Sequence, residues 1–321
     1  MNSVVLLILV LSLIATKVLS QECGCNQIPS IEIVNDPQIA NDIKEVRDFF
    51  LSKQPSSKFN RLSATILIRQ NKTNVWRRGS VDATLLAYPA SSVKLMYMYS
   101  AIEWCKSLGR PISCLDQYVR PMIIVSSNLA TGYVVDAITN TTNIDDMTST
   151  TDTRWAHWYY QRLSTERLLQ KLNLYENQIL RSKTYPTNSG QGPVGSEELI
   201  LEPPSSGNRF QSCCTASFML YLMQTRPANE VQYMQDKLYR ILESDETTFG
   251  NGLPAGTVIY SKIGCAYDTI EEIAYIILPS GQEIILSAFS NGFQRPAGDF
   301  YILGRFAELV LQKFSLMSPS S

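Results

Sequence analysis

The chain has 321 residues, which is long enough for one large domain or two closely packed ones with a substantial core. Its 28 basic and 29 acidic residues give a formal net charge of −1. This balance gives no sign of a polyanion-binding surface, so we expect no nucleic-acid partner.

An apolar run opens the chain over Val4–Ala15, and the short segment after it ends with a small residue, Ser20, before Gln21. This arrangement is typical of a secretory signal peptide, so we predict that residues 1–20 are cleaved and that the protein is secreted or extracytoplasmic. No Lys or Arg precedes the run, so an uncleaved membrane anchor remains an alternative. Against the anchor, the run is short for a membrane span and Lys17 interrupts its extension. We predict no membrane span after cleavage, because no other segment is long and apolar enough.

Seven cysteines follow the predicted signal peptide, and secretion would place them in an oxidising compartment. They are Cys23, Cys25, Cys105, Cys114, Cys213, Cys214 and Cys265. An odd number leaves at least one without a partner in the chain. Cys105 and Cys114 bracket a short turn and are the pair that we expect first. The adjacent Cys213 and Cys214 could suggest a metal, but no second cysteine pair or histidine cluster accompanies them, so we predict no metal site and no cofactor.

Two sequons for N-glycosylation are present. They are Asn71-Lys72-Thr73 and Asn140-Thr141-Thr142. In a eukaryotic source they would predict a secreted glycoprotein.

The chain from Asp36 to about Leu108 is predicted to form a helix, two strands and a second helix. Apolar residues recur at helical spacing in residues 36–53, where Asp36-Pro37 supplies a cap followed by proline. Residues 63–69 and 74–78 are two extended stretches joined by a turn, which predicts a hairpin. The second helix begins at Ser91.

From there to about Leu242 the pattern is helical and rich in loops. We predict helices in residues 127–138, 165–172, 215–224 and 229–242. Residues 141–152, rich in Thr and Asp, predict a surface insertion. Residues 185–208, rich in Pro, Gly and Ser, predict a long ordered loop.

Strands return after residue 252. We predict them in residues 257–263, 271–278 and 283–290, followed by an amphipathic helix in residues 297–314. The two ends of the chain therefore make one antiparallel sheet flanked by N- and C-terminal helices, with an all-helical subdomain inserted. This predicts an α+β fold with a cleft between its two parts. The expected boundaries are an α/β subdomain (residues 21–88 and 245–317), a helical subdomain (residues 89–244) and a tail (residues 318–321).

Three short polar motifs fall at the edges of the predicted cleft. The first is Ser91-Ser92-Val93-Lys94 at a helix start, where positions i and i+3 share a face, so the Lys94 ammonium can reach the Ser91 hydroxyl. A serine needs a base to act as a nucleophile, and a lysine held neutral by burial can serve. Alone, this spacing is better explained by a capping serine and a solvated lysine. The other two motifs are Ser126-Ser127-Asn128, opening a helix, and Lys262-Ile263-Gly264, ending a strand.

In order and setting, these motifs resemble the S-x-x-K, S-D-N and K-T-G set of the penicillin-recognising serine hydrolases, most closely the class A β-lactamase family. The resemblance spans about Asp36 to Phe314 and implies a β-lactamase-like fold. It implies that Ser91 is the acylated nucleophile and that Lys94 is its base or proton relay.

The same resemblance implies roles for the remaining motif residues. Ser126 would pass a proton toward the leaving amine, and Asn128 would donate to a substrate amide and hold Lys94. Lys262, with Gly264 in the same motif, would direct positive potential at a substrate anion. The backbone N–H groups of Ser91 and Cys265 would form the oxyanion hole.

The sequence departs from the family pattern in the motifs that bind substrate. Ser127 stands in place of the Asp of S-D-N, and Ile263 removes a hydroxyl that helps to bind a substrate carboxylate. Glu271 and Glu272 occupy the region where the family often places an arginine for the same carboxylate. We therefore do not predict recognition of a carboxylate.

The acid that completes the class A reaction is also missing. Those enzymes use the glutamate of an E-x-x-L-N loop to activate the water that hydrolyses the acyl-enzyme. No such motif occurs between Asn128 and Cys213, and residues 181–186, where the loop is expected, contain no acid. Glutamates elsewhere in the region include Glu176, Glu197, Glu198 and Glu202, none of them in that context. We predict that an acyl-enzyme would accumulate, so efficient penicillin hydrolysis is not expected.

A Ser-His-Asp triad is not expected, because the single histidine, His157, lies in an aromatic cluster and no serine stands in a G-x-S-x-G motif. The cluster comprises Trp155, Trp158, Tyr159 and Tyr160. It could be a platform on which a substrate stacks, but a local surface core is the favoured interpretation.

Two function classes remain. The first is a secreted serine hydrolase or acyltransferase that cuts a small-molecule or peptide-like amide or ester, such as a β-lactam, through acyl-Ser91. The second is a non-catalytic binding or structural protein with the same fold. The polar motif residues favour the enzyme, because a purely structural role would place no special demand on them. The missing glutamate favours the non-catalytic protein, or an enzyme whose substrate is not a β-lactam. We expect a monomer.

Overall fold

The computed structural model describes residues 23–54, 61–187, 190–202, 207–292 and 299–317. The predicted signal peptide and the predicted tail lie outside these residues, as does the start of the predicted C-terminal helix. Among the described residues, no helix has both the length and the apolar character needed to span a membrane.

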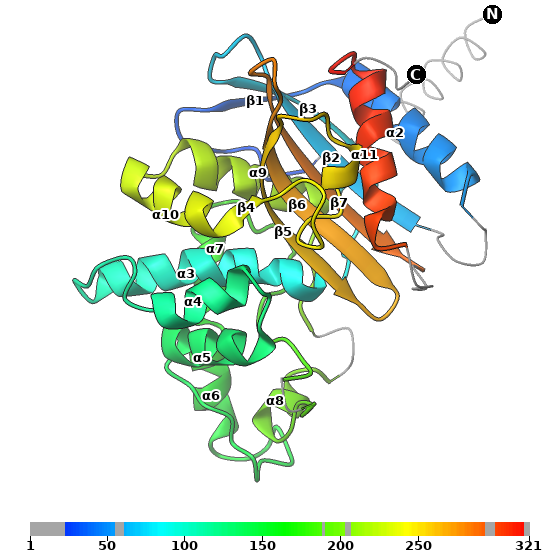
Figure 1. Ribbon diagram of the computed structural model, residues 1–321. Helices are drawn as coiled ribbons and strands as arrows, with labels where there is room; N and C mark the ends of the chain where they lie inside the picture. The colour runs from blue at the N-terminus through cyan, green and yellow to red at the C-terminus, as the bar shows by residue number, and fades with distance from the viewer. Residues whose placement is uncertain (1–22, 55–60, 188–189, 203–206, 293–298, 318–321) are drawn as a thin grey trace, which may run out of the picture.

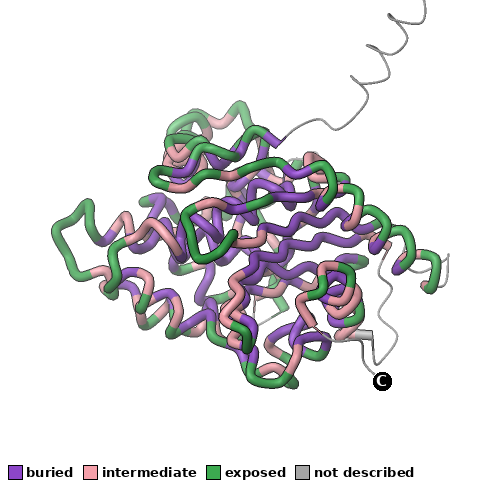
Figure 2. Tube along the Cα trace, turned by 90° about the horizontal axis from the view of Figure 1, so that it is seen from above, coloured by how far each residue is buried: buried purple, intermediate pink, exposed green. Residues whose placement is uncertain are grey.

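Seven strands form one sheet in the order β1-β3-β2-β7-β6-β5-β4. The strands are β1 Glu32–Asn35, β2 Arg61–Arg69, β3 Val75–Val81, β4 Tyr239–Arg240, β5 Val258–Ala266, β6 Thr269–Ile277 and β7 Glu283–Asn291. Neighbouring strands are antiparallel except for β1 and β3, which run parallel. Strands β6 and β7 are buried along almost their whole length, and Figure 2 shows this burial in the middle of the molecule. Burial on both faces predicts that helices cover both sides of the sheet.

Helices cover the sheet from both sides (Figure 1). On one face lie α2 (Pro37–Ser52) and α11 (Ile302–Lys313), which share a core that includes Phe50 and Phe306, with ring centroids 5.6 Å apart. On the other face lies α9 (Ser212–Gln224), which shares a second core with the helical part. Helix α2 begins where the sequence predicts, because the Asp36 carboxylate accepts hydrogen bonds from two backbone N–H groups of the first turn.

The helical part is built around α3 (Lys94–Ser107), which is buried on nearly every side. Its neighbours include α4, α5 and α7, and apolar residues on all of its faces let it serve as their common core. The remaining helices are α4 Asp116–Ile123, α5 Asn128–Thr139, α6 Trp155–Arg162, α7 Ser164–Gln170, α8 Ser196–Leu199 and α10 Ala228–Leu238. Short 3-10 turns are η1 Ala90–Val93, η3 Gly250–Gly252 and η4 Asp299–Tyr301.

The predicted α+β architecture is confirmed, with an antiparallel sheet between terminal helices and a helical insertion. Five short elements were not predicted: β1, β4, α4, α6 and α8. Strand β1 is a mostly exposed edge strand without alternation, and α4 contains Pro121, which conceals a helix in the sequence. The predicted helix of residues 229–242 ends at Leu238, where the chain turns into β4.

Three disulfides join the described cysteines: Cys23–Cys213, Cys25–Cys214 and Cys105–Cys114. The predicted Cys105–Cys114 pair is confirmed. The adjacent pair in α9 ties the N-terminal segment to the core, and the Arg78 guanidinium donates to the carbonyl oxygens of Cys23 and Cys25, both at 3.0 Å. Cys265 is not part of a disulfide.

The packing of α2 on β3 depends on Gly79, and we predict that Gly79→Ala destabilises the protein. An added Cβ would lie 2.5 Å from the backbone carbon of Ile39 and 2.6 Å from the nitrogen of Ala40. Because backbone atoms of a helix cannot move aside separately, the free energy of unfolding should fall by about 2–3 kcal/mol. Urea denaturation followed by circular dichroism would measure it.

Gly192→Ala is the matched control, since an added Cβ there would meet nothing within 4 Å. Its effect should stay within about 0.5 kcal/mol. Equal stabilities for the two variants would contradict the close α2–β3 contact.

Candidate active site

The three polar motifs predicted from the sequence meet at one place. Ser91 lies in η1, Lys94 begins α3, Ser126 precedes α5 and Lys262 lies in β5. A continuous chain of hydrogen bonds joins these four side chains. The site therefore draws on the sheet, through Lys262, and on the helical part, through the other three residues.

The backbone holds two positions of the site in an uncommon conformation. Ala90, directly before Ser91, has a φ of 40°, and Ser126 has a φ of 57°. A positive φ is unfavourable for a non-glycine residue, persists only where the surroundings enforce it, and is concentrated at functional sites. The fold thus fixes the backbone from which the hydroxyls of Ser91 and Ser126 project.

Gly264 lets β5 approach the turn that carries Ser91. A Cβ at this position would lie 2.5 Å from the Pro89 carbonyl oxygen and 2.9 Å from the Ser92 nitrogen. Glycine is therefore required for the contact between β5 and η1, because any side chain would push the turn away.

Lys94 is the centre of the hydrogen-bond network. Its Nζ donates to Ser91 Oγ at 3.0 Å, to Asn128 Oδ1 at 2.7 Å, and to the carbonyl oxygen and Oγ of Ser126 at 2.6 and 3.2 Å. None of these acceptors is a carboxylate. Lys94 is 0% exposed, and its burial lowers its pKa to about 7.

Lys262 reaches the same serine from the sheet. Its Nζ donates to Ser126 Oγ at 3.0 Å and to the Ile263 carbonyl oxygen at 3.0 Å. Burial, with smaller contributions from the charges of Lys94 and Arg240, holds the pKa of Lys262 well below its usual range. Ser126 Oγ is thus shared by two buried lysines.

Asn128 connects Lys94 to the loop between α7 and α8. Its Nδ2 donates to the Pro186 carbonyl oxygen at 2.6 Å, while its Oδ1 accepts from Lys94. Ser127, which replaces the family's Asp, accepts from the Ala130 N–H at 3.2 Å and so caps α5. The presence of Ser127 at the middle position leaves Ser126 and Asn128, on either side of it, in contact with Lys94.

Two acids of that region are engaged elsewhere. Glu197 is paired with Arg162 and with Lys183, and Glu176 accepts from the Gly24 N–H at 2.7 Å. Tyr185 stands directly before Pro186, and burial, helped by the charge of Glu197, raises its pKa above the usual value.

Glu271 and Glu272 are both 0% exposed. Glu272 accepts hydrogen bonds from Ser261, Thr247 and the N–H groups of Thr248 and Phe249, so it holds a loop. Glu271 lies opposite Gly264 beneath η1, and burial raises its pKa well above the usual range. Neither presents a carboxylate at the surface of the site.

The Cys265 side chain and the aromatic cluster of α6 both take part in apolar packing. The Cys265 side chain packs against the core between the sheet and α2 and α11. In α6, Trp155 stacks on Trp158 and Tyr159, and the Trp158 indole donates to the Thr142 carbonyl oxygen at 2.7 Å. These contacts describe a local core, with His157 exposed beside it.

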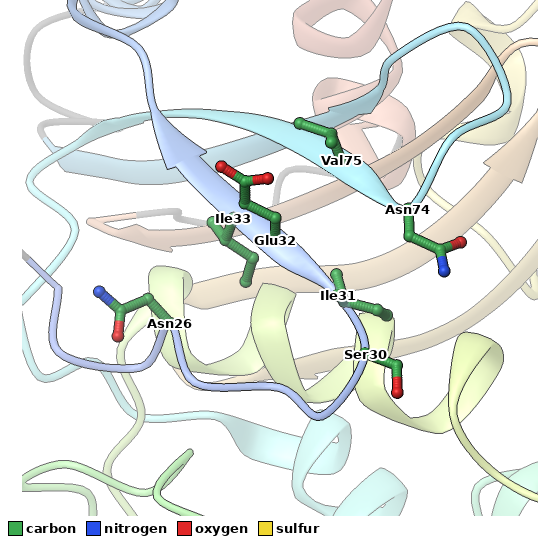
Figure 3. A pocket seen from close by; sticks show the side chains of 7 residues that line it. All are labelled: Asn26, Ser30, Ile31, Glu32, Ile33, Asn74 and Val75. Atoms are coloured by element: carbon green, nitrogen blue, oxygen red, sulfur yellow. The ribbon is translucent and has the colours of Figure 1, made fainter.

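A hollow of about 640 Å³ lies beside the edge strand β1 (Figure 3). Its walls are Asn26, Ser30, Ile31, Glu32, Ile33, Asn74 and Val75. None of these residues belongs to the Ser91 network, so this hollow is separate from the candidate site.

The sequence matches a model of the β-lactamase enzyme family over residues 100–314. The chain belongs to the β-lactamase enzyme family. The matched part contains Ser126, Asn128 and Lys262, and it begins after Ser91 and Lys94.

This β-lactamase-family chain is also 30% identical over 297 residues to golvesin of Dictyostelium discoideum. The alignment covers 91% of the chain and 51% of golvesin. The chain therefore spans about half the length of that relative.

Solved structures with the same fold include PBP-A (12% identity, TM-score 0.60, 91% of this chain and 100% of that one). Another is a class A β-lactamase representative from Bacteroides cellulosilyticus DSM 14838 (11% identity, TM-score 0.62, 87% and 99%). A mutant of PBP-A is similar at 14% identity and a TM-score of 0.60, over 90% and 100%, and was solved as an acyl-enzyme complex with penicillin G. At these identities the likeness concerns the fold, and it confirms the predicted β-lactamase-like architecture.

The sequence gives no signal for Arg240 at this site. Its guanidinium is buried and donates to the carbonyl oxygens of Ile123, Lys237 and Tyr239, at 3.2, 3.0 and 3.1 Å. It therefore links β4 to the end of α4, close to the Ser126 loop. Strand β4 has only two residues, which is too short for any periodic pattern.

Desolvation of Lys94 should make stability depend on pH. Its pKa is lowered on folding, so from about pH 7 to about pH 10 the unfolded chain binds more protons and stability rises with pH. Lys94→Met removes this dependence. We expect the stability of the variant relative to the native protein to fall by about 3.5 kcal/mol between those two pH values.

Chemical denaturation at both pH values would test this. Lys44→Met is the control, because the Lys44 side chain is 60% exposed and should show no such change. A relative stability of Lys94→Met that does not change with pH would show that Lys94 is not desolvated.

Proposed function

We propose that the chain is a secreted β-lactamase-like serine hydrolase that cuts a small-molecule or peptide-like amide or ester, such as a β-lactam, through a covalent acyl-Ser91 intermediate. The observation that carries the proposal is the 3.0 Å hydrogen bond from Lys94 Nζ to Ser91 Oγ, with Lys94 buried and its pKa lowered to about 7. A lysine with this pKa is partly neutral near neutral pH, and its neutral form can accept a proton.

In the proposed acylation, neutral Lys94 takes the Ser91 hydroxyl proton while Oγ bonds to the substrate carbonyl carbon. The proposal assigns the charge on the carbonyl oxygen to the backbone N–H groups of Ser91 and Cys265. The amide or ester bond then breaks, and Ser126 gives its hydroxyl proton to the leaving group. Ser126 is reprotonated from Lys94, with which it is hydrogen bonded.

The remaining residues would position the substrate. Lys262 supplies positive potential beside Ser126, and Asn128 holds Lys94 and offers its amide to the substrate. Gly264 keeps β5 against the nucleophile turn. The acyl-enzyme that a mutant of PBP-A forms with penicillin G supports this chemistry on the shared fold.

The alternative function is a non-catalytic binding or structural protein. It is favoured by the loop at Tyr185 and Pro186, which brings no carboxylate to the network around Lys94. We favour the enzyme, because burying two lysines beside one hydroxyl is unfavourable and has no evident structural benefit.

The proposal includes the setting of the protein. Three disulfides support secretion, following cleavage after residue 20. We further propose that the chain forms two subdomains, residues 21–88 with 245–317 and residues 89–244, which meet at the site. The proposed protein is a monomer. It carries glycans at Asn71 and Asn140, both of which are exposed.

We predict that a fluorophosphonate labels Ser91. The labelling rate should rise about tenfold between about pH 6 and about pH 8, as the neutral fraction of Lys94 rises. Intact-mass and peptide mass spectrometry would locate the adduct. Ser91→Ala should abolish labelling, Lys94→Met should slow it about 100-fold or more, and Lys44→Met should leave it unchanged. Absence of a Ser91 adduct from both a fluorophosphonate and a penicillin would sink the catalytic proposal.

We also predict that a penicilloyl adduct is long-lived, because no carboxylate of the described residues is hydrogen bonded to the network of Ser91, Lys94 and Ser126. Mass spectrometry after removal of free penicillin would follow its decay. Tyr185→Glu, which places a carboxylate beside Pro186, should shorten the lifetime by about tenfold or more. Rapid turnover of nitrocefin by the native protein would show that a deacylation base is present after all.

A further inference from the structure

Four of the seven cysteines lie together at the start of α9, and the proposed reaction does not use them. They are Cys23, Cys25, Cys213 and Cys214, and in the structure they form two disulfides. The sequence predicts no metal site here, because no second cysteine pair stands near Cys213 and Cys214 in the chain. The fold supplies that second pair, since Cys23 and Cys25 come from positions 190 and 189 residues away.

The sulfur atoms of these four cysteines have nearly the spacing of a tetrahedral metal site. The Sγ atoms of Cys23 and Cys214 are 3.8 Å apart, and those of Cys213 and Cys214 are 4.0 Å apart. The sulfurs of Cys23, Cys25 and Cys214 all lie within 4.8 Å of one another. Tetrahedral Zn–S bonds of about 2.3 Å place sulfurs about 3.8 Å apart, so small side-chain rotations after reduction would bring all four to one ion.

Hydrogen bonds that do not involve sulfur hold the N-terminal cysteines in place. The Arg78 guanidinium donates to the carbonyl oxygens of Cys23 and Cys25, both at 3.0 Å. The Ser217 hydroxyl of α9 donates to the same Cys25 carbonyl oxygen at 2.6 Å, and the N–H of the intervening glycine donates to Glu176 at 2.7 Å. Reduction of the two disulfides would therefore leave four thiols close together in a site that is already formed.

The surroundings of the four cysteines favour thiolates, which are the form that binds metal ions. Cys213 and Cys214 lie in the first turn of a 13-residue helix, whose N-terminal end carries a partial positive charge. The buried Arg78 guanidinium brings a full positive charge to the backbone of the other two cysteines. Four thiolates and one divalent cation have a net charge of −2, which these two positive features offset.

We propose that these four cysteines bind a thiophilic divalent cation, such as Zn²⁺, when their two disulfides are reduced. A thiol reductant converts each disulfide into two thiols and is itself oxidised to a disulfide, and binding of the ion then releases the four thiol protons. An all-sulfur ligand set selects zinc over magnesium or calcium. One ion thus replaces two disulfides as the link between the N-terminal segment and α9.

Titration of the reduced full chain with Co²⁺ tests the proposal. The protein is reduced with a phosphine, which becomes the phosphine oxide by taking oxygen from water, and is then desalted without oxygen. We expect one Co²⁺ per chain, with the visible absorption of a tetrahedral site and thiolate-to-cobalt charge-transfer bands, and we expect Zn²⁺ to abolish both. The oxidised protein should show neither. Reduced protein without this absorption would overturn the proposal.

Matched variants identify the sulfurs that bind. Cys23→Ser and Cys214→Ser each remove one ligand and should weaken Zn²⁺ binding about 100-fold or more, as measured by competition with a coloured chelator. The double variant Cys105→Ser with Cys114→Ser is the control, because it removes the other disulfide and should leave Zn²⁺ binding unchanged. Equal Zn²⁺ affinities for Cys23→Ser, Cys214→Ser and the control would contradict the assignment of the ligands.

Thermal unfolding distinguishes a site of the folded protein from thiols of an unfolded chain. Zn²⁺ at 100 times its dissociation constant should raise the unfolding midpoint of the reduced protein by about 5 °C, and Cys23→Ser should remove this increase. A midpoint that Zn²⁺ lowers or leaves unchanged, or a reduced chain that stays unfolded with Zn²⁺, would refute the site. None of these measurements involves Ser91, so the inference and the proposed function fail or stand separately.

Discussion

Lys94 and Lys262 share the hydroxyl of Ser126, at 3.2 and 3.0 Å, and the rest of the site depends on this arrangement. Two ammonium groups so close repel each other, and burial removes the water that would stabilise their charges. Their acceptors are hydroxyl, carbonyl and amide oxygens, which cannot balance two positive charges. The network is therefore most stable when at least one lysine is neutral, and a neutral lysine beside a serine is a base beside a potential nucleophile.

An arrangement that is unfavourable by itself must be enforced by the surrounding fold. The Ser91 turn is fixed between β5, where only Gly264 leaves room, and α3, whose apolar faces are packed on nearly every side. Strain at Ala90 and Ser126 is retained because residues buried in the core with the helical part, among them Val93, Ile123 and Ala130, flank both segments. Arg240 adds a link between β4 and the segment before Ser126, so the sheet and the helices hold the shared hydroxyl jointly.

The sequence predicted the fold and the motif residues for a specific physical reason. Long periodic elements such as α2 and the strands β5 to β7 carry a clear hydrophobic pattern, and S-x-x-K spacing places two side chains on one helical face. Strand β1, α6 and the two-residue β4 carry no such pattern, so they were not predicted. Arg240, the buried position of Glu271 and the contact between Asn128 and Pro186 could not be predicted either, because each depends on segments that only the tertiary structure brings together. Glu272 illustrates the limit well. Its place in the sequence suggested the loss of a contact to a substrate carboxylate, whereas the structure shows it holding the backbone of a loop.

The same geometry limits what can follow acylation in the proposed reaction. Hydrolysis of an acyl-enzyme needs a group that takes a proton from water, and the loop near Asn128 offers Tyr185, whose raised pKa keeps its hydroxyl protonated near neutral pH. Glu197 is held by Arg162 and Lys183, and Glu271 and Glu272 are enclosed within the sheet layer. Lys94 remains as the base, but it must first release the proton that it accepted from Ser91. Acylation in the proposed reaction can therefore proceed faster than the hydrolysis that would follow it, because Lys94 is free to accept a proton only in the first step.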